Sequence, residues 1–278
     1  MSALVAVAAF VVQTLVVFAG NSRLFGLLKP GSGWYTNVEM SMRYASLVTP
    51  ARWAFAIWGI IYLTEAAGML HLLLMPAHEV VFLQGSNTTL WVWANAFQAA
   101  WALLFATERL AMAALALAGI AVSLTWLSLS LCTVGALEYA LLAGPIWLHA
   151  GWTCAASIVN FNLVVGLAAD YSAQLAAAHA SAFVAAAVGV GTFLGAALST
   201  TCSPLVAAPM IAALCWALAA IRAELKSPVL IADSKVYAEI GELGRNALQL
   251  VVGGSALVMA GSVLFITCAW FVVTRAAD

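Results

Sequence analysis

The fold is decided by the stretch Thr49-Pro50-Ala51-Arg52-Trp53-Ala54-Phe55-Ala56-Ile57-Trp58-Gly59-Ile60-Ile61-Tyr62-Leu63-Thr64-Glu65. Pro50 fixes its own φ and suits the first turn of a helix, where no backbone donor is lost. The residues that follow are apolar and aromatic, and Trp58, Tyr62 and Glu65 stand at i, i+4 and i+7, on one helix face. A carboxyl group inside an apolar helix is costly in lipid, so Glu65 is expected to be neutral or paired.

The composition predicts an integral membrane protein. The chain has 278 residues, of which 65% are hydrophobic and only 8% are charged, and its mean hydropathy is +1.05. A soluble domain carries about 25% charged residues, which are needed to cover its surface. The net charge of −1 provides no basic field, so nucleic acid is excluded as a partner.

Eight apolar segments are predicted to cross the membrane. Because backbone amides in lipid must be hydrogen-bonded within the segment, the spans should be helices and the protein all-α. The fifth span is expected to kink near Pro145, and a surface helix is expected around Val236–Leu243. The predicted spans are Ala3–Ala19, Trp53–Met75, Thr88–Ala106, Leu110–Val134, Tyr139–Ala169, His179–Leu198, Pro204–Ala223 and Ala247–Val273.

The basic residues predict the orientation of these spans. With eight spans, the loops at 20–52, 107–109, 170–176 and 224–246 lie on one side and, together with Arg222 at the adjoining end of the seventh span, hold nine of the ten lysines and arginines, whereas the other side holds Arg275. Cytoplasmic loops are enriched in lysine and arginine. The membrane is expected to be a bacterial inner membrane or a plastid or mitochondrial membrane. Both termini are therefore expected to lie on the side that faces away from the cytoplasm, or away from the equivalent compartment of the organelle.

Two other spans carry a similar face of aromatic and hydrogen-bonding side chains. If the three faces converge, they enclose an aromatic cavity with a few polar groups, which is the usual composition of a small-molecule site. The third span carries Trp91, Asn95, Gln98 and Trp101, and the fifth carries His149, Trp152, Ala156 and Asn160.

Simpler interpretations exist for several of these residues. Asn95, Gln98 and Asn160 would then tie helices together by hydrogen bonds worth about 0.6–2 kcal/mol each. His149 is a candidate axial ligand for haem or chlorophyll, or else a partner of a neighbouring helix. The five cysteines show no metal-binding spacing and are expected to be small buried hydrophobic residues. Gly191 and Gly195 form a small-xxx-small pattern, which predicts close helix contact.

Three motifs, in this order and spacing, resemble a known family. They are Trp34-Tyr35 followed by Thr49-Pro50 and Trp53 to Tyr62, then Asn95-Ala-Phe-Gln-Ala-Ala-Trp101-Ala-Leu-Leu-Phe105, then Pro145 with Gly151-Trp152 and Asn160. Together they resemble the tryptophan-rich sensory protein family, which includes the translocator protein, also called the peripheral benzodiazepine receptor. The match is with the long form, which has extra C-terminal helices. It covers roughly residues 1–170, and residues 171–278 have no counterpart in the five-helix members.

The resemblance implies a five-helix bundle over residues 1–170, with a three-helix extension over 171–278. Family members bind porphyrins, haem, sterols and synthetic drugs in an aromatic cavity under the first loop. The second proline of the family's Pro-Pro pair is Ala51 here, so the start of the helix is expected to differ. By position, Trp34 and Tyr35 would belong to the loop, and Trp53, Trp58, Asn95, Trp101, Trp152, Ala156 and Asn160 would line or support the cavity.

These observations predict a non-enzymatic membrane receptor or carrier of a planar hydrophobic ligand, with a tetrapyrrole such as porphyrin, haem or chlorophyll favoured. Trp58, Trp101 and Trp152 would stack on the ring. Asn95, Asn160 and a protonated Glu65 would orient its polar substituents, with Tyr62, Gln98 and His149 as further candidates for contact.

The alternative is an accessory structural or pigment- and lipid-binding subunit of a photosynthetic or respiratory complex. Bound lipid and a homo-oligomer are expected in either case. A third option is oxidative porphyrin breakdown, for which the sequence offers no nucleophile–base pair or metal constellation.

Overall fold

The computed structural model describes residues 2–75, 80–199 and 202–277, and the regular elements of these residues are all helical. Eight helices in this part of the chain are long and apolar enough to cross a membrane, as predicted. They are α1 (Ala3–Asn21), η1 with α3 (Arg52–Ala56 and Ile57–Leu74), α4 (Asn87–Ala106), α5 (Leu110–Ser130), α6, η3 and α7 (Ala136–Glu138, Tyr139–Ala143 and Gly144–Ala168), α8 (Tyr171–Leu198), η4 with α9 (Pro204–Ala207 and Ala208–Lys226) and α11 (Gly241–Ala277).

Three short helices complete the described chain: α2 (Asn37–Arg43), η2 (Val81–Leu83) and α10 (Lys235–Glu239). The surface helix expected around Val236–Leu243 is only partly present. It is limited to α10, because the last spanning helix begins already at Gly241.

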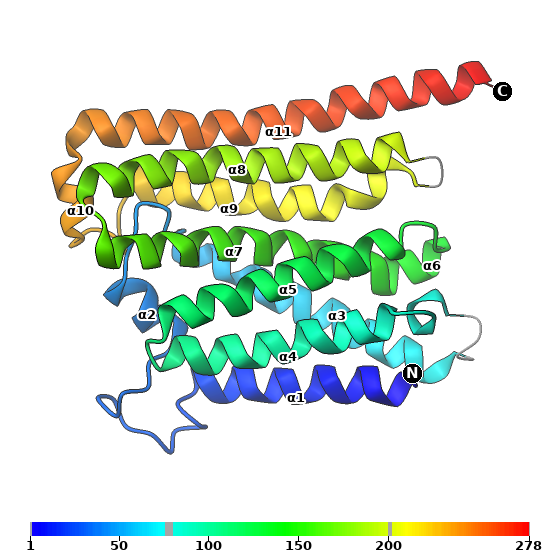
Figure 1. Cartoon of the computed structure of the whole chain (residues 1–278), viewed down its shortest axis with the longest axis horizontal. Coiled ribbons are helices and arrows are strands. Elements are labelled where there is room, and N and C mark those ends of the chain that lie inside the picture. The colour runs from blue at the N-terminus through cyan, green and yellow to red at the C-terminus, as the bar shows by residue number, and fades with distance from the viewer. Residues whose placement is uncertain (1, 76–79, 200–201, 278) are drawn as a thin grey trace.

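The helix α7 lies in the middle of the bundle and belongs to both of its cores. The spanning helices run side by side, with α1 at one edge and α11 at the opposite edge (Figure 1). One core joins α1, α3, α4 and α5 to Ile146 and Ala150 of α7. The other joins α3, α8, α9 and α11 to Trp147 and Trp152 of α7. The C-terminal helices therefore pack directly on the N-terminal bundle. The division at residue 170 stays a prediction.

The irregularity expected near Pro145 is a π-helical turn, η3, which directly precedes α7. Pro145 has no backbone N–H, so the carbonyl of Leu141 loses its usual helical partner. This carbonyl lies against Gly68 of α3, where a Cβ would collide with it. The proline therefore shapes the contact between α3 and the fifth span.

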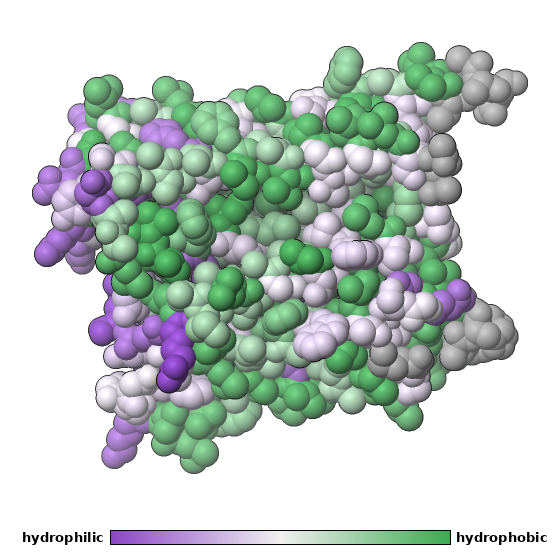
Figure 2. Space-filling model, in the orientation of Figure 1, coloured by the Kyte–Doolittle hydropathy of each residue, from purple (hydrophilic) through white to green (hydrophobic). Residues whose placement is uncertain are grey.

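On the face shown in Figure 2, the most hydrophilic residues gather at one end of the bundle, where α2 and α10 lie, and hydrophobic residues dominate the middle. The nine basic residues assigned to one side lie in the loops and helix ends at this end, which we call the basic end. The two chain termini lie at the other end (Figure 1).

A disulfide joins Cys132 to Cys202 at the end opposite the basic end. It ties the connection after α5 to the connection after α8. The expectation that all cysteines are unpaired small residues is therefore wrong for these two, because their positions on neighbouring connections bring them together. Disulfides persist in oxidising compartments. The bond thus agrees with the orientation inferred from the basic residues.

Glycines set the closest helix contacts, although not the glycines that the sequence suggested. A Cβ on Gly151 of α7 would lie 2.5 Å from the backbone oxygen of Met210 in α9, and one on Gly189 of α8 would collide with Met259 of α11. At Gly191 and Gly195 a Cβ would meet nothing within 4 Å. The small-xxx-small prediction is therefore wrong for this pair, because these glycines face outward.

We predict that Gly151→Ala destabilises the protein by about 1–3 kcal/mol, since the α7–α9 backbones must separate to admit the methyl group. Gly195→Ala is the matched control, because it adds the same group to a helix where space is open. The measurement is thermal unfolding of both variants in the same detergent. Equal stability of the two variants would contradict the packing described here.

Candidate functional site

Five polar side chains from four helices form one hydrogen-bonded network inside the membrane. Glu65 Oε1 of α3 lies 2.7 Å from His149 Nδ1 of α7, and His149 Nε2 lies 3.1 Å from Gln98 Oε1 of α4. Gln98 and Gln13 of α1 both donate their side-chain amides to the Tyr62 hydroxyl, each at 3.0 Å. Glu65, Gln98, His149 and Gln13 are buried. The sequence spacing predicted that Tyr62 and Glu65 share one face of a helix, and that face of α3 contributes both residues to the network.

The hydrogen bonds determine how many protons the Glu65–His149 pair holds. Because the Gln98 amide donates to Tyr62, its oxygen accepts from His149 Nε2, which must carry a hydrogen. The short contact on the other side of the ring then holds one proton between Nδ1 and the carboxyl of Glu65. The pair is neutral overall, as lipid favours. Both ring nitrogens are occupied, so His149 is not placed to be an axial ligand.

Trp58 separates this network from a cavity. Its ring stacks on Tyr62, with centroids 5.5 Å apart, and meets the ring of His149 edge-on, also at 5.5 Å. Trp58 also stands beside Trp101 and Trp152, at 6.3 and 6.2 Å. The aromatic faces of α3, α4 and α7 therefore converge, as their spacing predicted.

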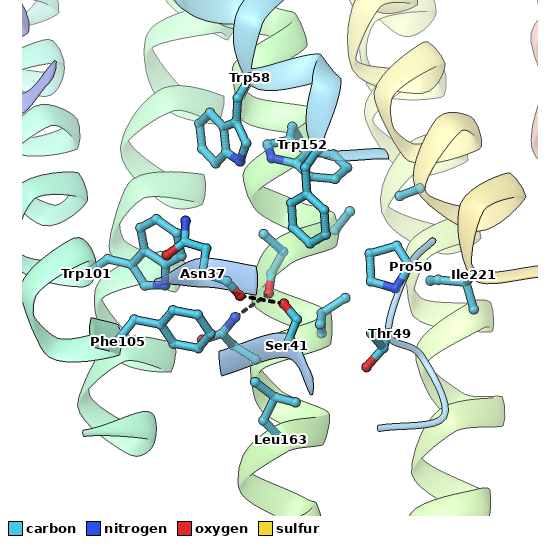
Figure 3. Close-up of a pocket in the computed structure, with 16 residues that line it drawn as sticks. Asn37, Ser41, Thr49, Pro50, Trp58, Trp101, Phe105, Trp152, Leu163 and Ile221 are labelled. Carbon is cyan, nitrogen blue, oxygen red and sulfur yellow. Dashed lines mark hydrogen bonds between the residues drawn. The ribbon is translucent and has the colours of Figure 1, made fainter. Parts of the chain in front are cut away.

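The cavity lies under α2 near the basic end; its free volume is about 50 Å³, and about 660 Å³ is reached only when all the space between the lining atoms and the open solvent is counted. Figure 3 shows Trp101 and Phe105 on one side of it, and Pro50 and Ile221 on the other. No charged side chain is among the described residues that line it. They are Asn37, Ser41, Thr49, Pro50, Phe55, Trp58, Trp101, Phe105, Trp152, Ala155, Ala156, Val159, Asn160, Leu163, Ala217 and Ile221.

Three polar atoms of the cavity lining have no hydrogen-bond partner. They are the indole N–H groups of Trp101 and Trp152 and the amide oxygen of Asn160, on side chains that are 5%, 3% and 5% exposed. Each unsatisfied buried group costs about 1–3 kcal/mol, so it needs an explanation. Buried atoms without partners also occur outside the cavity lining, at the indole N–H of Trp147 and the hydroxyls of Ser46 and Ser128.

A comparison with family models finds one match, to the TSPO-like protein family, over residues 3–240. The chain belongs to this family. The assignment confirms the resemblance to the tryptophan-rich sensory proteins, and the match extends beyond the first five spans through α8, α9 and α10. No curated protein and no solved structure matches the chain.

The first loop of this TSPO-like protein is anchored near its C-terminal end, by Trp34 and Tyr35. Trp34 donates its indole N–H to Gly20 at the end of α1, and the backbone N–H of Tyr35 bonds Ala106 at the end of α4. Both residues thus belong to the loop, as the resemblance implied. They hold the loop in place and do not line the cavity.

The helix α2 at the cavity mouth is held by a capping box. Thr36 accepts from the backbone of Glu39, and the Glu39 carboxylate accepts from the backbone of Thr36 and contacts Arg23. The bond from the Thr36 backbone holds the pKa of Glu39 below its usual range. The cap therefore stabilises α2 at neutral pH and is lost as the pH falls through the acid range. Its other end is held by Glu108, which accepts from Arg43 and Tyr44.

The predicted site residues separate into four groups. Trp58, Trp101, Trp152, Ala156 and Asn160 line the cavity, and Tyr62, Glu65, Gln98 and His149 form the network. Trp34 and Tyr35 anchor the loop, as described above. The last group, Trp53 and Asn95, lies elsewhere.

The structure corrects the roles expected for Trp53 and Asn95. Trp53 is 45% exposed and packs against Trp216 of α9, with ring centroids 4.8 Å apart. Asn95 donates to the backbone oxygen of Trp91 in its own helix. Helical spacing gives the face on which a side chain lies, and it does not reveal whether the amide turns back to its own backbone.

The contribution of α9 to the cavity could not be read from the sequence motifs. Ala217 and Ile221 form one wall. They are positioned by two hydrogen bonds to the start of the second span: the backbone N–H of Ala51 donates to Ala220, and the indole of Trp216 donates to Ala54. A proline at position 51 has no N–H. Ala51, in place of the second proline of the family's pair, was therefore the sequence feature that could have indicated the contact between the second span and α9.

Among the described residues, no group of three or more histidine, cysteine or acidic side chains is close enough to hold a metal ion.

We predict that Glu65→Gln leaves stability nearly unchanged, because the glutamine amide can donate to His149 Nδ1 as the protonated carboxyl does. Glu65→Leu should cost about 1–3 kcal/mol, since it leaves the buried nitrogen unpaired. Thermal unfolding of both variants tests this. If Glu65→Gln were as damaging as Glu65→Leu, the neutral pair would be the wrong description.

Proposed function

We propose that this protein is a membrane receptor or carrier that binds a planar hydrophobic ligand, with a tetrapyrrole favoured, in the aromatic cavity beneath α2. One observation supports this most directly: two indole donors and one amide acceptor in the cavity lining are buried without partners. A ring system that carries both an acceptor and a donor would satisfy them.

The shape of the aromatic lining favours a flat ligand. The rings of Trp58 and Trp101 are nearly parallel, at 24°, and those of Trp101 and Phe105 are inclined by only 19°. Aromatic surfaces arranged in this way favour offset stacking on a planar partner. Trp152 meets Trp58 edge-on at 89°, so its N–H is directed differently from those of the stacked rings.

The absence of charge in the described lining limits where an acidic substituent would lie. A propionate buried against Trp152 would have no cation to pair with, which is costly in a dry site. The polar residues Asn37 and Ser41 stand at the mouth, on α2. We therefore place the apolar face of the ligand among the tryptophans and its acidic substituents toward the basic end. Glu65, which the sequence suggested as a direct partner, acts through His149 instead.

We predict that Trp101→Phe and Trp152→Phe each weaken binding of protoporphyrin IX about threefold to tenfold. This is the loss of roughly one neutral hydrogen bond while the aromatic surface is kept. Binding is measured by quenching of tryptophan fluorescence in lipid nanodiscs. The matched control is Trp93→Phe, which changes a side chain on the same helix as Trp101 that is 55% exposed.

Equal affinity of all four proteins would contradict this use of the cavity. The proposal is for binding or transport without catalysis, so the absorbance spectrum of the bound porphyrin should not change during incubation. Progressive loss of its main absorption band would instead favour oxidative breakdown.

The alternative role, as an accessory subunit, is favoured by one feature of the last helix. Only 6% of the residues in the most apolar window of α11 are buried, against 28–56% in the other seven spans. A larger membrane assembly would cover this surface. Co-purification with a large complex in mild detergent would support this role, and a monomer or dimer free of other subunits would count against it.

A further inference from the structure

Trp58 is shared by the cavity and the polar network. Trp58 lines the cavity together with Trp101 and Trp152. Its ring also packs against the rings of His149 and Tyr62, which belong to the network. A change of occupancy in the cavity therefore reaches the Glu65–His149 pair through one intervening side chain.

The pair can change its charge only by gaining or losing a proton. With one proton between Glu65 and His149, the pair is neutral and needs no water. With a second proton it is a cation, and with none it is an anion, and either charge is expensive in lipid unless water or a counter-ion is close.

No other ionisable group among the described residues can neutralise these charged forms directly. The helices α1, α4 and α5 carry no ionisable side chain, and the network residues that they contribute are Gln13 and Gln98. The remaining ionisable groups of the elements that pack against α3 and α7 make no described hydrogen bond or ion pair with Glu65 or His149. They are Arg52, Tyr62, His71, Glu138, Tyr139, Cys154, Tyr171, His179, Cys215, Arg222, Glu224 and Lys226.

Water that solvates a charged pair can approach it on two sides of Trp58, from the cavity and from a hollow beside α1 that Trp58 lines together with Tyr62. A ligand bound in the cavity displaces the water on the cavity side. Ligand binding and charging of the pair thus compete for the same space, and such coupling acts equally in both directions.

We propose that Glu65 and His149 form a proton-binding site within the membrane, and that the cavity binds its ligand tightly only while this site holds one proton. This inference rests on the proposed ligand-binding function and adds proton linkage to it. Acidification or alkalinisation past the neutral range then releases the ligand. A compartment of different pH could exploit this to unload a carrier.

The linkage predicts the shape of the pH profile. Affinity is constant where the pair holds one proton. This range has an acid edge, below which the pair takes up a second proton, and an alkaline edge, above which it loses its proton. Beyond either edge, the fraction of the protein that holds one proton at the pair falls about tenfold per pH unit, and the apparent Kd rises by the same factor. Glu65→Gln cannot lose the carboxyl proton and should lack the alkaline edge. His149→Gln cannot take up the second proton and should lack the acid edge.

The experiment uses the full chain in nanodiscs, with the nickel complex of protoporphyrin IX dimethyl ester as probe. This compound has no free propionate or ring N–H, so its own titration does not interfere. The Kd is measured by tryptophan quenching from about pH 5 to about pH 9, a range that extends to both sides of the ordinary pKa of a histidine side chain. The matched control is Tyr62→Phe, which removes a network hydroxyl without removing a group that titrates in this range, and it should keep both edges.

A Kd that stays constant within twofold over the whole range overturns the inference, as do edges that persist in both the Glu65→Gln and His149→Gln variants. Calorimetry on the unmodified protein gives a test that needs no variant. Binding heats measured well beyond an edge, in two buffers of different ionisation enthalpy, should differ by the ionisation enthalpy difference for about one proton, and equal heats overturn the proposal. If the ester binds at every pH but with a flat profile, only the linkage fails. If neither the ester nor protoporphyrin IX binds at any pH, the ligand-binding function itself fails.

Discussion

The bilayer core offers no hydrogen bonds, so each polar group inside the bundle needs a partner within the protein or a bound molecule. Glu65, His149, Gln98, Tyr62 and Gln13 satisfy one another across four helices. Close beside them, on the other side of Trp58, the indole N–H groups of Trp101 and Trp152 have no partner. A general need to tie helices together would explain the first group and not the second. The contrast separates polar groups that are satisfied within the bundle from cavity-lining groups that are not.

One of the C-terminal helices, α9, helps to form the cavity. Ala217 and Ile221 of α9 form one wall of the cavity. The hydrogen bonds made by the Ala51 N–H and the Trp216 indole fix the position of this wall relative to the second span. The family match, which continues to residue 240, includes α9 and ends before α11. The helix α11 packs on the outside of α8 and α9, away from the cavity (Figure 1). Within the C-terminal region, α9 therefore lines the cavity, whereas α11 packs at the periphery.

The sequence predicted what lipid dictates, and it could not predict what depends on partners across helices. Eight spans followed from hydropathy, and convergence of three aromatic faces followed from helical period, because both are local properties. The partner of His149 depends on how α4 is rotated against α7. The same period that placed Gln98 in the network placed Asn95 where its amide turns back to Trp91. Likewise, pairing of Cys132 with Cys202 and contact at Gly189 instead of Gly191 are set by packing between distant segments.

The two ends of the bundle are built differently, and the difference bears on how a ligand could exchange. At the end opposite the basic residues, the Cys132–Cys202 bond ties two connections covalently. At the basic end, α2 covers the cavity mouth and is held by side-chain contacts of Glu39 and Glu108. Such contacts are partly exposed and individually weak, so they can open far more readily than a covalent link. Exchange is therefore expected at the basic end, which the distribution of lysine and arginine assigns to the cytoplasm or its organellar equivalent.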